Sequence, residues 1–216
     1  MSCVSWHTPH IERCSFSVRK NQYAPSMRVG SIAPMWSKVY GRRNTHCDSV
    51  TRYIFSLLGV KTVFQTKNPG VVQTVTLKQN GRCVPKLEYD FVNSPDLAQT
   101  FVVTCLAKDI PFHFKGLATL KIKETDRIEA LKTEARKLGY VVKSLNDSEL
   151  LWDGERCEPA FDEGIDTYED HRMALAFAPF ALLRPGLLIN NPQVVSKSYP
   201  KFWEDLSSVG FEVKSE

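Results

Sequence analysis

The sequence predicts a mixed α/β fold over residues 48–216, preceded by a segment of different character over residues 1–47. Three observations support this prediction: helical and strand patterns alternate after Asp48, one helix–glycine–strand pattern recurs, and charged residues gather where strands give way to helices. The chain has 216 residues, 43% of them hydrophobic, which is enough for one sizeable domain.

The recurring pattern is a helix, a glycine and an alternating strand. Its copies are LLGVKTVFQ, KLGYVVKSL and SVGFEVKSE, in which the glycines are Gly59, Gly139 and Gly210. Each glycine suits the left-handed conformation that commonly follows a helix end. Such arrangements are frequent in α/β proteins, but similar flanking residues in all copies favour an internal repeat.

The remaining elements follow in order. We expect helices with apolar stripes at 48–58, 94–108, 125–138 and 200–209, and an oily helix at 171–183 that is kinked near Pro179. Ser94 is the expected cap of the second helix, with Pro95 at its first position. Strands are expected at 60–65, 71–77, 86–91, 113–116, 119–122, 140–145, 149–154, 186–191 and 211–215.

Residues 1–47 carry the excess positive charge and show no sustained periodicity. Glu12 is their one acidic side chain, whereas the remainder of the chain is slightly acidic, although the net charge is +4. A basic, acid-poor segment is typical of a transit peptide. We favour instead the interpretation that this atypical segment is an unrelated or out-of-frame start, or is disordered. The basic side chains of this segment are Arg13, Arg19, Lys20, Arg28, Lys38, Arg42 and Arg43.

The cysteines indicate neither a disulfide framework nor a metal site. The chain has six, with no CxxC pair, so we expect free thiols in a reducing cytoplasm. Cys3, His7, His10 and Cys14 do not have the spacing of a zinc finger, and no metal site is predicted. No apolar stretch is long enough to span a membrane.

Charged residues gather at two strand-to-helix junctions. KIKETDR places Lys123, Glu124 and Arg127 around the start of the helix at 125–138, and Thr125 or Asp126 can cap it. YEDHRMA opens the oily helix with Arg172, although a cation at a helix start is unfavourable for the helix itself. A bound anion explains that placement. The alternative for both motifs is a capped helix with solvated charges, in which Asp170 is the N-cap of the oily helix.

Two further charges lie at similar junctions. Asp96 stands in the first turn of the helix at 94–108, and Lys197 lies between a strand and the last helix. Each alone is weak evidence, since Asp96 also complements the helix dipole. Together, cations and carboxylates at these junctions favour a small polyanionic substrate that undergoes proton transfer, and not a nucleic acid, because no basic face stands out.

These motifs resemble a known family. PDLAQT, KETDR, DHRMA and the lysine of VVSKSYP occur in the order found in the C-terminal half of the EPSP synthases, over roughly residues 47–216. The sister family of UDP-N-acetylglucosamine enolpyruvyl transferases lacks this pair of motifs, so it is the less favoured alternative. The resemblance implies the enolpyruvyl transferase fold, in which repeated βαβαββ units build two domains, one of them incomplete here.

The resemblance also implies a reaction of the shikimate pathway, in which enolpyruvyl passes from phosphoenolpyruvate to shikimate 3-phosphate without a cofactor. Asp96 corresponds to the aspartate that contacts the shikimate hydroxyl and accepts its proton, and Glu124 to the acid that serves the methylene carbon. Lys123 corresponds to a contact of the shikimate phosphate, and Thr119 stands where some members carry an asparagine. The implied phosphoenolpyruvate clamp is Arg127, Arg172 and Lys197.

The family's N-terminal domain has no counterpart in this sequence. We therefore expect little or no turnover from this chain alone, and activity only with a separate N-terminal half. The alternative is a non-catalytic remnant that binds anions weakly.

Overall fold

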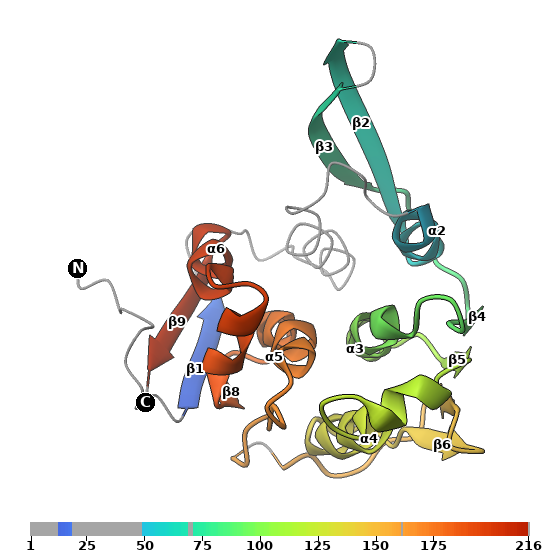
Figure 1. Ribbon diagram of the computed structural model, residues 1–216, viewed down its shortest axis with the longest axis vertical. Coiled ribbons are helices and arrows are strands. Elements are labelled where there is room, and N and C mark those ends of the chain that lie inside the picture. The colour runs from blue at the N-terminus through green and yellow to red at the C-terminus, as the bar shows by residue number, and fades with distance from the viewer. Residues whose placement is uncertain (1–12, 19–48, 69–70, 161, 216) are drawn as a thin grey trace.

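The computed structural model describes residues 13–18, 49–68, 71–160 and 162–215 (Figure 1). Within these residues the strands form three sheets, and helices α3, α4 and α5 lie between the two larger ones. The α/β class predicted from the sequence is confirmed.

The largest sheet is built by residues 87–152 and has the strand order β4-β5-β7-β6. β4 and β5 are parallel, whereas β7 is antiparallel to both β5 and β6. In chain order the unit is β4-α3-β5-α4-β6-β7, which is the expected βαβαββ arrangement. Its elements are β4 (Leu87–Asp90), α3 (Ala98–Lys108), β5 (Phe112–Lys115), α4 (Arg127–Lys137), β6 (Lys143–Leu145) and β7 (Glu149–Trp152).

A two-stranded hairpin precedes this unit and extends away from the rest of the molecule (Figure 1). Its elements follow the same order as those in the second half of the unit, namely a helix, a glycine and two antiparallel strands. Its elements are α2 (Ser49–Leu57), β2 (Val60–Asn68) and β3 (Val71–Gln79).

The third sheet joins the two ends of the described chain, with the order β8-β1-β9 and antiparallel pairing throughout. Its central strand β1 lies within residues 1–47, where the sequence shows no sustained periodicity and no element was predicted. The strand escapes sequence analysis because its pairing partners lie at the far end of the chain. The elements of this region are β1 (Arg13–Val18), α5 (His171–Phe177), β8 (Leu187–Asn190), α6 (Phe202–Ser208) and β9 (Phe211–Ser215).

Short 3₁₀ helices complete the fold, and one of them corrects a prediction. Residues 119–122 were expected as a strand, but they belong to η3, because four alternating residues are too few to fix a period. The predicted kink at Pro179 is confirmed, since α5 ends at Phe177 and continues as η4. The 3₁₀ helices are η2 (Pro95–Leu97), η3 (Ala118–Ile122), η4 (Ala178–Leu182) and η5 (Pro192–Lys197).

The repeated glycines adopt the predicted backbone conformation. Gly59, Gly139 and Gly210 have φ values of 91°, 90° and 104°, each between a helix and the following strand. Helix α3 lies in the core, and every one of its residues from Ala98 to Ala107 is buried. This buried helix directly follows η2, the short 3₁₀ helix that carries Asp96.

Gly116 connects β5 to η3 and lies against the end of β4. Its φ is 73°, and a Cβ there would overlap the Asp90 side chain and the Val92 backbone. Gly81 has nearly the same φ, 71°, but open space around it. We expect Gly116→Ala to lower the free energy of unfolding by about 3 kcal/mol and Gly81→Ala by about 1 kcal/mol, measured by urea denaturation. Equal losses in the two variants would contradict the close approach at Gly116.

Candidate functional site

Asp96 lies in η2, one turn before the buried helix α3. Pro95 occupies the first position as predicted, but the Ser94 side chain makes no capping hydrogen bond, so the predicted cap is wrong in that respect. The Asp96 side chain is 38% exposed. A short 3₁₀ turn thus presents this carboxylate at the edge of the core.

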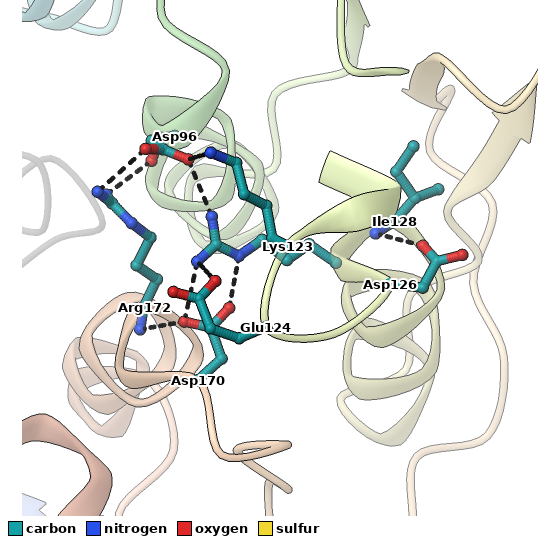
Figure 2. A network of polar contacts seen from close by, with 8 residues as sticks. Asp96, Lys123, Glu124, Asp126, Ile128, Asp170 and Arg172 are labelled. Carbon is teal, nitrogen blue, oxygen red and sulfur yellow. Dashed lines mark hydrogen bonds and ion pairs between the residues drawn. The ribbon is translucent and has the colours of Figure 1, made fainter. Parts of the chain in front are cut away.

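The KETDR turn brings Lys123, Glu124 and Arg127 to the start of α4. Lys123 leaves η3 in extended backbone, and Asp126 caps α4 by accepting hydrogen bonds from the backbone N–H groups of Ile128 and Glu129, at 3.1 and 3.2 Å (Figure 2). Asp126 therefore fills the predicted capping role, and Arg127 becomes the first residue of the helix.

Arg127 is the centre of the site, and its side chain is only 1% exposed. Its Nε donates to Asp170 Oδ2 at 2.5 Å, and its Nη1 donates to Asp96 Oδ1 at 2.9 Å. Its Nη2 donates to Glu124 Oε2 at 2.6 Å and to Asp170 Oδ1 at 3.3 Å. One guanidinium thereby ties together three segments that are far apart in the sequence.

Asp170 caps α5 and is wholly buried. Its Oδ1 accepts the backbone N–H of Arg172 at 2.8 Å while both of its oxygens accept from Arg127. The predicted N-cap is therefore confirmed. The pairing with Arg127 was not foreseen, since it joins residues 43 positions apart.

Arg172 and Lys123 both reach Asp96 (Figure 2). Arg172 Nη2 lies 3.2 Å from Asp96 Oδ2, its Nη1 donates to the Asp96 backbone carbonyl at 3.1 Å, and Lys123 Nζ lies 3.6 Å from Asp96 Oδ1. Their side chains are 33% and 36% exposed. These two cations, unlike Arg127, are open to an approaching anion.

Charges in this cluster are balanced. The cations Lys123, Arg127 and Arg172 face the carboxylates Asp96, Glu124 and Asp170. Both arginines stand in the first turns of helices, where the dipole disfavours a cation, and the carboxylates offset that cost.

The surroundings shift the pKa values of two titrating groups in this cluster. A hydrogen bond from its own backbone lowers the pKa of Glu124, against partial burial, and nearby Arg127 lowers it further. Burial lowers the pKa of His171, which Asp170 only partly offsets. At neutral pH the Glu124 carboxylate is therefore charged and His171 is neutral.

Of the residues predicted from the sequence, Asp96, Lys123, Glu124, Arg127 and Arg172 come together in one network. Lys197 and Thr119 do not join this network: Lys197 ends η5, which packs against α5, and Thr119 lies on η3, both with exposed side chains. Asp170 is the member of the network that the sequence predicted only as a helix cap. The sequence feature that could have indicated its further role is the DHR triplet at the start of a buried helix.

No group of three or more His, Cys, Asp or Glu side chains in the described segments is arranged to hold a metal ion. Cys3, His7 and His10 lie outside those segments. Helices in the described part of the chain are all too short or too polar to cross a membrane.

The chain is similar to proteins of known activity. Residues 54–206 match the family model described as EPSP synthase (3-phosphoshikimate 1-carboxyvinyltransferase). A 3-phosphoshikimate 1-carboxyvinyltransferase of Bacteroides fragilis is 54% identical over 173 residues, covering 80% of this chain and 41% of that protein. One of Neisseria gonorrhoeae is 35% identical over 132 residues, covering 61% and 30%. The chain thus spans about two fifths of the length of the first of these curated relatives.

Solved structures show the same fold. An EPSP synthase of Acinetobacter baumannii matches with a TM-score of 0.59 at 16% identity, covering 75% of this chain and 39% of that one. The match covers one part of a larger architecture. The division of this chain into 1–47 and 48–216 stays a prediction, and the family match falls within the second part.

Proposed function

Because this chain belongs to the EPSP synthase family, we propose that it supplies one wall of a 3-phosphoshikimate 1-carboxyvinyltransferase active site. Its substrates are then phosphoenolpyruvate and shikimate 3-phosphate. The observation that carries the proposal is the convergence of Asp96, Lys123, Glu124, Arg127 and Arg172 from three segments. The six cysteines, with no CxxC pair, fit a reducing cytoplasm.

In the proposed reaction the substrate hydroxyl adds to the enol carbon of phosphoenolpyruvate. Asp96 takes the hydroxyl proton, and Glu124 gives a proton to the methylene carbon, which becomes a methyl group. Phosphate then leaves and takes up the proton held by Asp96, while the methyl group returns a proton to Glu124, and the new enol ether remains. Arg127, Arg172 and Lys197 stabilise phosphoenolpyruvate and the departing phosphate, and Lys123 with Thr119 holds the shikimate phosphate.

An arriving anion has to exchange partners with carboxylates that already occupy the cations. Arg172 and Lys123 are the accessible ones, whereas Arg127 is reached only by displacing Asp96 or Glu124. Adding negative charge beside Glu124 raises its pKa from the lowered value of the free site. Binding should therefore bring in the proton that Glu124 needs as an acid.

Calorimetry with phosphoenolpyruvate alone tests this site. We expect a dissociation constant on the order of 1 mM, because only part of the enzyme is present. The heat should differ between buffers of different ionisation enthalpy at the same pH, which reports proton uptake, and Glu124→Gln should remove that difference. No binding at 10 mM would contradict the proposed clamp, and buffer-independent heat would contradict the role of Glu124.

Turnover separates this proposal from the alternative of a non-catalytic remnant. We expect no phosphate release from the chain alone and restored release on adding a separately produced N-terminal part of an EPSP synthase. Failure of every such mixture, although the chain remains folded by circular dichroism, would favour the remnant. Normal release by the chain alone would contradict the need for a second part.

A further inference from the structure

A second polar cluster lies on α4, two turns after Arg127. Glu134 is wholly buried and accepts hydrogen bonds from Tyr168 Oη at 2.6 Å and from the backbone N–H of Asp166 at 3.0 Å. Lys137 Nζ lies 3.0 Å from Glu134 and 2.7 Å from Asp166. The proposed chemistry uses none of these groups, yet they tie α4 to the loop that precedes α5.

That loop has an unusual backbone. Tyr168 and Glu169 adopt φ values of 53° and 57°, a left-handed conformation in two successive residues other than glycine. Such strain persists only where the surroundings enforce it. On one side the backbone of Ile165 donates to Leu188 at 2.9 Å and accepts from Asn190 at 2.8 Å, and both partners belong to β8. On the other side the loop is held by Glu134 and Lys137.

The loop ends at Asp170, which orients both guanidinium groups of the candidate site. It receives the Arg127 Nε–H, and it caps the helix that carries Arg172. Because Arg127 and Glu134 are seven residues apart, they lie on the same face of α4. Helix α4 therefore contacts the loop at two points: Glu134 binds Tyr168 and the Asp166 backbone, and Arg127 binds Asp170.

We propose that Glu134 is a positioning residue of the anion site, which fixes the 164–170 loop so that Asp170 meets Arg127 and the first turn of α5. The proposal rests on the proposed function, in which Arg127 and Arg172 bind phosphoenolpyruvate. Burial raises the pKa of Glu134, against the hydrogen bonds from Tyr168 and Lys137 that favour its charged form. Burying a carboxylate costs free energy of desolvation, so a buried glutamate at this position indicates a specific role.

The chain supplies a matched control on the same helix. Glu129 pairs with Lys132 at 2.7 Å with the same three-residue spacing, but the Glu129 side chain is 56% exposed. Glu134→Gln and Glu129→Gln therefore remove the same charge from the same kind of pair. Only the first touches the loop. Tyr168→Phe removes one hydrogen bond to Glu134 and serves if Glu134→Gln does not fold.

Two measurements test the proposal on the folded chain, at a temperature well below its unfolding midpoint. By calorimetry, Glu134→Gln should weaken phosphoenolpyruvate binding about tenfold, whereas Glu129→Gln should leave it unchanged. By NMR, the Arg127 Nε–H is protected by Asp170, and Glu134→Gln should speed its exchange with water at least tenfold. A purely stabilising Glu134 leaves binding unchanged and speeds exchange at Arg127 no more than at the most protected backbone amides, and that result would overturn the proposal.

The two measurements also keep the proposals apart. If the unmodified chain does not bind phosphoenolpyruvate, the proposed function fails, and Arg127 exchange alone decides the role of Glu134. Exchange that speeds up more at Arg127 than at the most protected backbone amides, in both Glu134→Gln and Tyr168→Phe, supports positioning, while an equal change at both contradicts it.

Discussion

Arg127→Met should lower the free energy of unfolding by about 3–5 kcal/mol, a large share of the total for a domain of this size. The substitution removes the guanidinium that is 1% exposed and leaves Asp170 wholly buried without its charge partner. Asp96 and Glu124 lose an ion pair as well, although both are partly exposed and regain water. Urea denaturation followed by circular dichroism gives the free energy by linear extrapolation.

A double variant identifies the source of this loss. Arg127→Met with Asp170→Asn removes both charges of the buried pair while asparagine still caps α5, so it should recover part of the stability lost in the single variant. Arg127→Lys keeps the charge without the fork, and we expect it to fall between the single variant and the unmodified chain. A loss below 1 kcal/mol in Arg127→Met would contradict the organising role of this residue.

Arg172→Gln should have the opposite profile, with a large effect on binding and a small one on stability. Its side chain is 33% exposed, so losing its pair with Asp96 should cost at most about 1 kcal/mol of unfolding free energy. Phosphoenolpyruvate binding should weaken at least tenfold, since a hydrogen bond to a charged ligand contributes about 1.5–3 kcal/mol. Calorimetry and urea denaturation on the same preparation separate the two effects.

Arg136→Gln is the matched control for Arg172→Gln. Arg136 is exposed in the last turn of α4, at the opposite end of that helix from Arg127. Arg136→Gln should measurably change neither phosphoenolpyruvate binding nor the free energy of unfolding. Equal weakening of binding in both variants would indicate a general loss of positive charge instead of a defined contact at Arg172.

Local patterns in the sequence predicted most of the helices and strands. The helix at 125–138 and the glycines that follow three helices depend on neighbouring residues, so they are readable without the fold. Residues 119–122 were misjudged because an alternating run of four residues also fits a 3₁₀ turn. Strand β1 was missed because its stability depends on β8 and β9.

Candidate site residues were predictable as charges at junctions, but their partners were not. The motifs pointed to Arg127 and Arg172 as anion ligands, a role that stays a prediction. The sequence could not show that Arg127 donates hydrogen bonds to three carboxylates, because Asp96 and Asp170 lie 31 and 43 residues from it. Glu134 was missed since a glutamate inside a helix ordinarily faces solvent.

The order β8-β1-β9 bears on how the chain folds. β8 and β9 pair with β1 but not with each other, so the sheet forms only when a segment near the beginning of the chain meets the last strands. Pairing across such a separation has a large entropic cost of loop closure. It is therefore slow compared with forming the local hairpin of β2 and β3. During synthesis β1 is made before β8 and β9, so this sheet can assemble only after the strands of the hairpin and of the four-stranded sheet have been made.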